Sequence, residues 1–574
     1  MRTLLSLVFL VMSSAALAQT QADPEAATGF EPKPLVQAQQ HIIVAANPLA
    51  AEAGLAILRA GGSAADAAIA ALLVLNVVEP QSSGIGGGAF ALVDDPSAGL
   101  TAWDAREIAP AGATPQLFLG ADGEPLPFLK AVQSGRSVGA PGLVALMSRL
   151  HAKHGKLPWQ DLFQPAILLA DAGFPVSPRL SGLLARYSER LAGTDAAQVF
   201  VPNGVPLAEG TILRQPALAK TLRLLASDGA GAFYAGTIAG QIVDAVTRGP
   251  MPGTLNATDL AGYRVVTRAP VCHPYRQYRV CGMGPPSSGA TTVGQILMLL
   301  DRFKPTELEL DEARLWHLFA EASRLAYADR GQYLADADFV KVPVRGLLDP
   351  AYIAQRSRLI HGFQASEGRA EAGDPPWREG RYAPSVQSDS PGTTHLSVID
   401  STGLAISLTA SIETAFGSGR MAGGFLLNNQ LTDFSFRPLG AVGTPIANAP
   451  AAGKRPRSSM SPTIVYLQDR VAVLTGSPGG SRIPEYVAGS LIAQLAFDLD
   501  PAAAAAFPHV SHRNRGEIAI EPGMPSAVSE GLRQFGHQVV EKDMTSGLGI
   551  IAVGADGTLQ GGADPRREGI ALGD

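Results

Sequence analysis

A threonine that opens a β-rich run is the strongest candidate for chemistry in this chain of 574 residues. Thr393 follows Gly392, the last residue of a stretch rich in Gly, Pro and charge, and begins the run Thr-Thr-His-Leu-Ser-Val-Ile. A threonine hydroxyl becomes a good nucleophile only when a base takes its proton. If the chain were cut between these two residues, the new α-amine of Thr393, with a pKa of about 7.7–8.0, would be that base. The alternative is an ordinary β-branched strand.

Two glycine-rich stretches could surround this nucleophile. The sequence Gly-Ser-Pro-Gly-Gly-Ser at 476–481 contains two adjacent glycines, whose backbone N–H groups could point into a cavity as an oxyanion hole requires. It is not a serine nucleophile elbow, because Thr475 occupies the first glycine position of that motif. The sequence Gly-Ile-Gly-Gly-Gly-Ala at 84–89 has the spacing of a dinucleotide fingerprint, but a helical pattern precedes it and a strand pattern follows. The alternative for both stretches is a tight backbone turn.

Three polar segments could hold a small charged substrate. Arg106 follows a strand pattern and would make either a forked contact with a carboxylate or a surface ion pair. The charged segment 454–462 contains paired serines and either offers hydroxyl and N–H groups to a carboxylate or is a solvated loop. The segment 428–434 sets several polar side chains among apolar ones, where they would either accept hydrogen bonds from an ammonium group or close a turn.

The hydrophobic pattern predicts a layered α+β fold. A stretch without hydrophobic periodicity, 364–392, separates a mainly helical part from a part rich in strands, and the threonine stands at this boundary. Expected helices cover 48–60, 63–77, most of 142–245, 292–300, 308–337 and 484–499. Expected strands lie within 90–103, 265–280, 393–400, 404–412, 425–428, 471–475 and 547–560. Because several of these strands are joined by short turns, we expect antiparallel sheets covered by helices.

The composition favours a globular protein that acts on a small or peptide-like substrate. The formal net charge is −6 and the sequence has no long basic run, which argues against a nucleic acid partner. The two cysteines, Cys272 and Cys281, do not make a metal site with their neighbours, and we expect no metal and no cofactor. Strand patterns flank a turn centred on 276–277, so the two thiols either form a cross-strand disulfide or stay reduced in the core.

The N-terminus has the three parts of an export signal. Arg2 provides the positive charge, 4–12 is an apolar run too short to span a bilayer, and Ala-Leu-Ala at 16–18 is a cleavage site. The alternative is a buried N-terminal helix. We therefore expect a signal peptide at 1–18, a disordered polar segment at 19–34, and export to the periplasm or secretion, with no later membrane span.

Taken in order, these motifs resemble the γ-glutamyltransferase family over nearly the full length of the chain. The motifs that carry the resemblance are Glu-Pro-Gln-Ser-Ser-Gly-Ile-Gly-Gly-Gly at 79–88, Asp-Ala-Arg-Glu at 104–107, His-Gly-Lys-Leu-Pro-Trp at 154–159, Pro-Pro-Ser-Ser-Gly at 285–289, Thr-Thr-His at 393–395, Asn-Asn-Gln at 428–430, and the segments 454–462 and 476–481. The resemblance implies an N-terminal nucleophile hydrolase, with two stacked antiparallel sheets in a four-layer αββα sandwich. It also implies self-cleavage into a large subunit, 35–392, and a small subunit, 393–574, that stay associated.

The resemblance gives each motif a role. Thr393 would cut the chain after Gly392 and then carry the γ-glutamyl group of glutathione or a related donor to water, an amino acid or a peptide. The remaining roles would be oxyanion binding by Gly479 and Gly480, support of the Thr393 amine by Ser411, binding of the donor's α-carboxylate by Arg106, Ser458 and Ser459, and binding of its α-amine by Glu413, Gln430 and Asp433.

Three departures from the family pattern leave other activities open. Ser411 stands where a second threonine is usual, and Glu413 where many members have asparagine. The segment 438–449 is shorter than the family's lid loop and has no aromatic residue, so bulkier donors or more water would enter. A cephalosporin or glutaryl acylase is therefore an alternative within the same fold, and an unprocessed peptide-binding homologue is an alternative from a different class.

Overall fold

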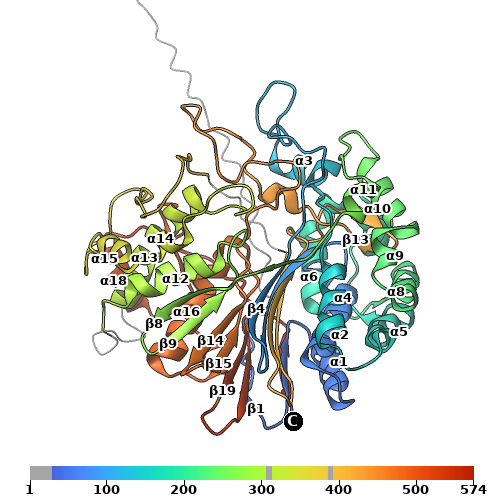
Figure 1. Ribbon diagram of the computed structural model, residues 1–574, viewed down its shortest axis with the longest axis horizontal. Helices are drawn as coiled ribbons and strands as arrows, with labels where there is room; N and C mark the ends of the chain where they lie inside the picture. The colour runs from blue at the N-terminus through green and yellow to red at the C-terminus, as the bar shows by residue number, and fades with distance from the viewer. Residues whose placement is uncertain (1–28, 305–312, 386–391) are drawn as a thin grey trace, which may run out of the picture.

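Two stacked antiparallel sheets form the centre of the protein (Figure 1). The computed structural model describes residues 29–304, 313–385 and 392–574. The expected signal peptide and the expected polar segment as far as residue 28 lie outside these residues. Among the helices of the described part, none has the length and apolar character needed to cross a membrane.

Thr393 begins an inner strand of the first sheet. In the described residues this sheet has seven strands in the order β21 (Ile570–Gly573), β2 (Ile42–Ala45), β10 (Thr393–Ile399), β11 (Ala405–Ser411), β3 (Gly88–Asp95), β4 (Gly99–Ala105) and β7 (Val266–Arg268). The second sheet, counted over the same residues, has the order β1 (Val36–Ala38), β20 (Leu559–Ala563), β19 (Gly549–Val553), β15 (Arg470–Thr475), β14 (Thr463–Leu467), β9 (Tyr278–Gly282) and β8 (Val271–Tyr275). Each sheet therefore combines strands from both sides of residue 393.

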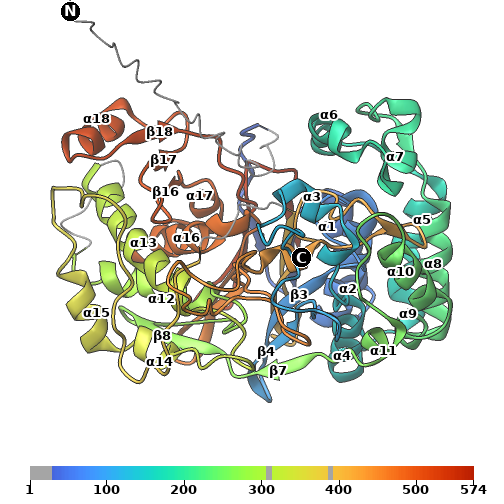
Figure 2. The ribbon, with the colours of Figure 1, turned by 90° about the horizontal axis from the view of Figure 1, so that it is seen from above.

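Helices cover the outer face of each sheet (Figures 1 and 2). The first sheet shares a hydrophobic core with α1 (Pro48–Arg59), α2 (Ala64–Val78), α4 (Leu143–His154), α5 (Gln164–Ala172), α8 (Pro216–Asp228) and α10 (Thr237–Thr247). The second shares a core with α12 (Gly289–Leu300), α13 (Ala313–Tyr333), α16 (Ile483–Phe497), α17 (Pro501–Ala505) and α18 (Ser526–Gln534). This arrangement confirms the expected four-layer αββα sandwich.

The smaller elements lie around these four layers. They are α3 (Phe128–Val132), α6 (Pro178–Leu191), α7 (Asp195–Phe200), α9 (Gly231–Tyr234), α11 (Ala257–Ala261), α14 (Val344–Leu347), α15 (Pro350–Ser357), β5 (Phe174–Pro175), β6 (Ile212–Leu213), β12 (Met421–Ala422), β13 (Phe425–Leu426), β16 (Val510–Ser511), β17 (Ile518–Ile520) and β18 (Val539–Glu541).

Local sequence signals explain the boundaries of the helices that support the first sheet. Asn47 caps α1, and Pro48 occupies its first turn. Ser63 and Asp66 form a reciprocal capping box at the start of α2, all of whose residues are buried. The apolar residues cover the whole circumference of α2, which is typical of a helix between two layers of a core. Both helices were expected with nearly these bounds.

Other elements refine the expectations. The expected strand region 90–103 is the hairpin of β3 and β4, and the region 265–280 divides into β7, β8 and most of β9. The expected helix 308–337 is described only from 313 and ends at Tyr333. A tight turn with Arg276 at φ 54° joins β8 to β9, places Cys272 opposite Cys281, and lets a disulfide bond connect them.

Candidate active site

Two neighbouring strands fix the position of the Thr393 hydroxyl. β10 pairs with β11 in a register that places Thr393 opposite Ser411. Both residues are buried, with 4% and 3% of their surface exposed. The guanidinium of Arg567 donates a hydrogen bond of 3.4 Å to the carbonyl of Thr393. The β-branched run is therefore a strand, as the simpler interpretation required. Its pairing with β11 fixes the Thr393 side chain next to Ser411.

The peptide bond before Thr393 is held in a chain of hydrogen bonds. The Thr393 hydroxyl donates to Ser411 Oγ at 3.3 Å, and the Ser411 hydroxyl donates to the carbonyl oxygen of Gly392 at 2.7 Å. The backbone N–H of Ile412 donates to the same carbonyl at 3.3 Å. Two donors on one carbonyl oxygen stabilise negative charge that develops there when a nucleophile attacks. The sequence indicated Ser411 but gave no signal for the N–H of Ile412.

The backbone around Gly392 leaves no room for a side chain. A Cβ atom added there would lie 2.3 Å from the carbonyl oxygen of Glu413 and 2.6 Å from that of Thr414. Backbone atoms cannot move aside as the end of a flexible side chain can. The residue before Thr393 must therefore be glycine for this close approach to form.

The glycine run at 84–89 supports the site by close packing. It connects α2 to β3, in the reverse order of a dinucleotide-binding unit. A Cβ on Gly87 would lie 2.2 Å from the carbonyl oxygen of Ser411, and a Cβ on Gly88 would lie 2.7 Å from Oε2 of Glu107. Without side chains, Gly87 and Gly88 can lie directly against Ser411 and Glu107. This agrees with the interpretation of the motif as a tight backbone turn.

Arg106 and Asp433, predicted to bind opposite ends of a donor, bind each other. Arg106 is 1% exposed and donates to Asp433 Oδ2 at 2.5 Å. It also donates to the backbone carbonyls of Pro456 at 3.2 Å and Arg457 at 3.0 Å. A molecule that carries both a carboxylate and an ammonium could exchange partners with this pair, because each charge would find its opposite.

The two other predicted α-amine ligands lie beside this pair. Gln430 donates to Asp433 Oδ2 at 3.0 Å. Oε2 of Glu413 accepts a hydrogen bond of 2.6 Å from the side-chain amide of Asn429. The backbone of Glu413 has φ 83°, a left-handed conformation that costs a non-glycine residue about 1–3 kcal/mol. The surrounding structure therefore compensates for the strain of the Glu413 backbone.

Ser458 and Ser459 face the same pocket through contacts with α12 and α13. The Ser458 carbonyl accepts hydrogen bonds from the backbone N–H and the hydroxyl of Ser288. Arg330 of α13, which is 4% exposed, donates to Ser459 Oγ at 2.6 Å and to Ser288 Oγ at 2.9 Å. Sequence reasoning missed Arg330, because every residue of α13 from Leu315 up to it is also buried and no polar face distinguishes it.

A small cavity brings most of the predicted residues together. It is lined by Arg106, Thr393, Ser411, Glu413, Gln430, Asp433, Ser458, Ser459, Met460, Gly480, Ser481 and Ile483. Its volume of about 20 Å³ admits roughly one water molecule.

The two glycines predicted to bind an oxyanion differ in their surroundings. Gly480 lines the cavity and has φ 60°. Gly479 does not line it, and a Cβ there would lie 2.4 Å from the ring of Tyr486. Both glycines have a positive φ, which favours residues without a Cβ. The loop 476–481 thus turns tightly beside Thr393 and places the backbone of Gly480 at the wall of the cavity.

Glu107 is a buried carboxyl group next to the Arg106 anchor. It is 0% exposed, and neither oxygen has a hydrogen-bond partner among the described residues. Its Oε2 lies 3.9 Å from Arg106 Nη1. Burial raises the pKa of Glu107 to about 8, although the charge of Arg106 opposes this change. At neutral pH the group is therefore mostly protonated, and the hydrogen bond of Arg106 goes to Asp433 instead.

This burial predicts a pH-dependent loss of stability. An unfolded glutamate ionises near pH 4.5, whereas folded Glu107 stays protonated to about pH 8, so unfolding releases a proton between these values and stability falls as pH rises. Glu107→Gln should remove this dependence. We expect the free energy of unfolding of the variant, relative to the native sequence, to increase by on the order of 3–4 kcal/mol from pH 5 to pH 8 in urea titrations. Exposed Glu52→Gln is the control. Parallel pH curves for Glu107→Gln and the native sequence would contradict the assignment.

The residues described by the structure contain no group of three or more His, Cys, Asp or Glu side chains able to hold a metal ion. The arrangement offers instead a buried hydroxyl nucleophile, a polarised carbonyl and a charged anchor. Such a set can perform acyl transfer by covalent catalysis.

Known proteins similar to this chain match it over nearly its whole length. The sequence model of the family described as gamma-glutamyltranspeptidase matches residues 50–574. The glutathione hydrolase proenzyme of Bacillus subtilis (strain 168) is 38% identical over 545 residues, 93% of this chain and 91% of that protein. The glutathione hydrolase proenzyme of Escherichia coli (strain K12) is 39% identical over 544 residues, 92% of this chain and 91% of that protein. The crystal structure of cephalosporin acylase from Bacillus halodurans has a TM-score of 0.84 and 28% sequence identity, covering 96% of this chain and 99% of that one.

Proposed function

This chain belongs to the gamma-glutamyltranspeptidase family, and from that premise we propose that it is a self-processing γ-glutamyl hydrolase and transpeptidase with Thr393 as its nucleophile. Its donors are glutathione and related γ-glutamyl compounds, and its acceptors are water, amino acids and peptides. The observation that carries the proposal is the hydrogen-bond chain from the Thr393 hydroxyl through Ser411 to the carbonyl of Gly392.

Self-cleavage uses the bonds of this chain. The Thr393 hydroxyl oxygen attacks the carbonyl carbon of Gly392 and passes its proton toward Ser411, while Ser411 and the N–H of Ile412 hold the developing oxyanion. The C–N bond then breaks, the amine takes up the proton, and an ester links Gly392 to the threonine oxygen. Water hydrolyses the ester, which leaves a carboxylate on Gly392 and a free hydroxyl and α-amine on Thr393.

Turnover uses the new amine as the base. It takes the proton of the Thr393 hydroxyl as the oxygen attacks the γ-carbonyl of the donor, and backbone N–H groups of Gly479 and Gly480 stabilise the oxyanion. The departing amine receives the proton and leaves a γ-glutamyl ester on Thr393. Water or an acceptor amine attacks this ester and restores the hydroxyl. Arg106 and Asp433 hold the donor's α-carboxylate and α-amine, in place of their bond to each other.

The processed enzyme consists of a large subunit, 35–392, and a small subunit, 393–574. We place a removable signal peptide at 1–18 and the mature protein in the periplasm, from the order of charge, apolar run and small residues in the sequence. Of the polar segment expected to be disordered at 19–34, residues 29–34 are described, and the backbone N–H of Glu31 donates to the carbonyl of Pro565 at 2.9 Å. A gel of purified native protein tests the processing: two fragments joining at 392–393 support it, and a chain that stays intact would favour a peptide-binding role instead.

An acylase of glutaryl-type amides is the second candidate, and one observation favours it. A cephalosporin acylase has nearly the same fold as this chain, with a TM-score of 0.84. A glutaryl donor differs from a γ-glutamyl donor only in lacking the charged α-amine.

Comparison of γ-glutamyl and glutaryl anilides separates the two candidates. We expect a γ-glutamyl preference of about 10²–10³-fold in kcat/KM, because a glutaryl group leaves the buried carboxylates of Glu413 and Asp433 without their ammonium partner. Glu413→Gln should reduce the preference, mainly through the KM of the γ-glutamyl substrate. Equal rates on the two anilides would favour the acylase, and a ratio unaffected by Glu413→Gln would remove that residue from the amine site.

A further inference from the structure

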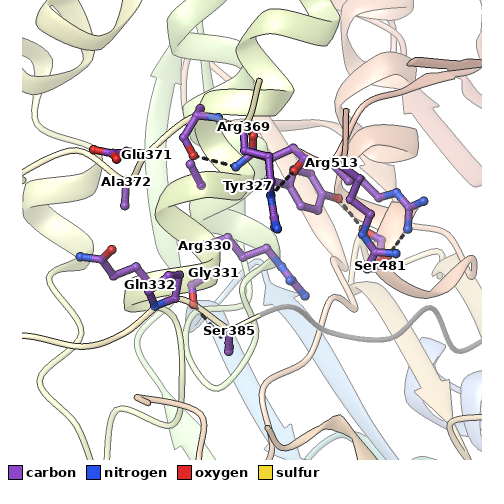
Figure 3. Close-up of a pocket in the computed structure, with 15 residues that line it drawn as sticks. Tyr327, Arg330, Gly331, Gln332, Arg369, Glu371, Ala372, Ser385, Ser481 and Arg513 are labelled. Atoms are coloured by element: carbon purple, nitrogen blue, oxygen red, sulfur yellow. Dashed lines mark hydrogen bonds between the residues drawn. The ribbon is translucent and has the colours of Figure 1, made fainter. Parts of the chain in front are cut away.

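A larger, positively charged cavity adjoins the nucleophile pocket (Figure 3). Its volume is about 730 Å³, within the usual range for sites that bind small molecules. Among the described residues that line it, the charged ones are Arg330, Arg369, Arg513, Arg515 and Glu371. The lining therefore carries a net charge of +3. A cavity wall of this charge attracts anions, and the guanidinium groups match the planar geometry of carboxylates.

The single acidic residue of the lining does not neutralise the cavity near the nucleophile. Glu371 is exposed, and Figure 3 places it at the far end of the cavity from Ser481. Behind the wall, Glu485 accepts a hydrogen bond of 3.4 Å from the backbone N–H of Arg513, but it also accepts from the hydroxyl of Ser511 and does not line the cavity. Two arginines of the lining contact residues of the nucleophile pocket: Arg513 donates to Ser481, and Arg330 donates to Ser459.

Two loops from opposite sides of the cleavage point build the wall. The side chain of Asn514 makes two hydrogen bonds with the backbone of Ala370, at 2.7 Å and 2.9 Å, and Arg369 donates to the carbonyl of Asn514 at 3.2 Å. Arg513 and Asn514 have φ 39° and 57°, so the chain turns sharply and both Arg513 and Arg515 line the cavity. Strained residues of this kind persist only where the surroundings hold them, and they cluster at functional sites. The arginines are therefore positioned before any ligand arrives.

Two residues connect this cavity to the nucleophile pocket. Ser481 lines both, and it accepts hydrogen bonds from Tyr327 at its carbonyl and from Arg513 at its hydroxyl, at 2.7 Å in the second case (Figure 3). Buried Arg330 lines the large cavity and donates to Ser459, which lines the small one. A donor whose glutamyl end reaches the small pocket can therefore extend its other end into the arginine-lined space.

We infer that this cavity is a subsite for a carboxylate on the part of the substrate beyond the scissile amide, either the leaving half of the donor or the acceptor that replaces it. The inference rests on the proposed function, because it takes the acyl group to lie at Thr393. The leaving amine and the attacking acceptor amine occupy the same position in the forward and reverse steps of acyl transfer. The same arginines therefore select an acidic leaving group and an acidic acceptor.

The test on the donor side compares a γ-glutamyl nitroanilide with its ring-carboxylated analogue. We expect native enzyme to prefer the carboxylated anilide about tenfold in kcat/KM, and the double variant Arg369→Gln/Arg515→Gln to lose that preference while keeping its rate on the plain anilide. Raising the ionic strength should weaken the preference as well, because the groups are partly exposed. The matched control is Arg223→Gln on α8, an exposed arginine in the opposite helical layer. An equal ratio in the native enzyme and the double variant would overturn the inference.

The acceptor side has its own test. Glycylglycine carries a carboxylate and glycylglycinamide does not, so the double variant should lose rate with the first acceptor and little with the second. A change on the donor side alone would assign the subsite to the leaving group, and a change with acceptors alone would assign it to the acceptor.

A binding measurement separates this inference from the proposed function. If native enzyme turns over neither anilide, the proposed function fails, and calorimetry of glycylglycine and glycylglycinamide then decides on the cavity alone. Tighter binding of the acid by native protein, lost in the double variant, supports a carboxylate subsite. Equal binding of the acid and the amide excludes one.

Discussion

Thr393→Ala should leave the chain uncut and abolish turnover, a loss of at least about 10⁴-fold in kcat. The substitution removes the only atom that attacks in both reactions of the proposed mechanism, so no acyl-enzyme forms. It also removes the donor of the 3.3 Å hydrogen bond to Ser411, but leaves the bond from Ser411 to the Gly392 carbonyl. The backbone of β10 should therefore stay in place. A denaturing gel and an assay with a γ-glutamyl anilide measure the two losses.

Thr393→Ser is the matched control for that experiment. It keeps a hydroxyl at the same position but lacks the methyl group that restricts rotation about χ1, so cleavage and turnover should be slower and still measurable. If Thr393→Ala splits at the same bond as the native chain, another group performs the cleavage and the assignment of the nucleophile is wrong.

Arg106→Ala should raise the KM for γ-glutamyl donors by about 10²–10³-fold. Removing one partner of a buried ion pair costs about 3–5 kcal/mol, because the remaining charge stays buried without compensation. In this variant Asp433 and the carbonyls of Pro456 and Arg457 lose the guanidinium that donates hydrogen bonds to them. The donor's α-carboxylate loses its cationic partner as well. Steady-state kinetics on a γ-glutamyl anilide checks this prediction. We expect KM to change more than kcat.

Arg106→Lys separates charge from geometry in the same assay. A lysine keeps the positive charge but cannot reach Asp433 and the two carbonyls with one planar fork, so an intermediate KM is expected. Processing of each variant on a gel shows whether the small subunit still folds. A KM close to that of the native enzyme in processed Arg106→Ala would remove this residue from the donor site.

Short motifs made much of the site predictable from the sequence. Thr393, Gly480 and Arg106 each lie in a segment with a distinct local pattern, and the segments could be compared with a family one at a time. The alternation of apolar residues after Thr393 also indicated β10 and β11 correctly. Such signals depend on neighbours a few residues apart, which is the range over which sequence patterns are informative.

The rest of the site depends on contacts between distant segments. Arg106 and Asp433 are separated by 327 positions, and nothing local indicates that they pair. Arg330 follows a run of α13 whose residues from Leu315 on are all buried, so its contact with Ser459 has no periodic signal. The raised pKa of Glu107 results from its complete burial, which the residue's charged type alone would not suggest. β14 was missed as well, although it is as long as the predicted strand 471–475.

The strand order of the first sheet determines whether folding involves one molecule or two. β10 and β11 lie between β2 and β3, so the two pieces made by a cut at 392–393 share one sheet and cannot part without breaking it. Before the cut, the chain unfolds and refolds as a single molecule at any dilution. After the cut, the unfolded state is two molecules, and refolding becomes a second-order encounter that slows as the protein is diluted. Under the proposed processing, the uncut chain is the form in which the fold is assembled, and recovery from unfolding should depend on concentration only after the cut.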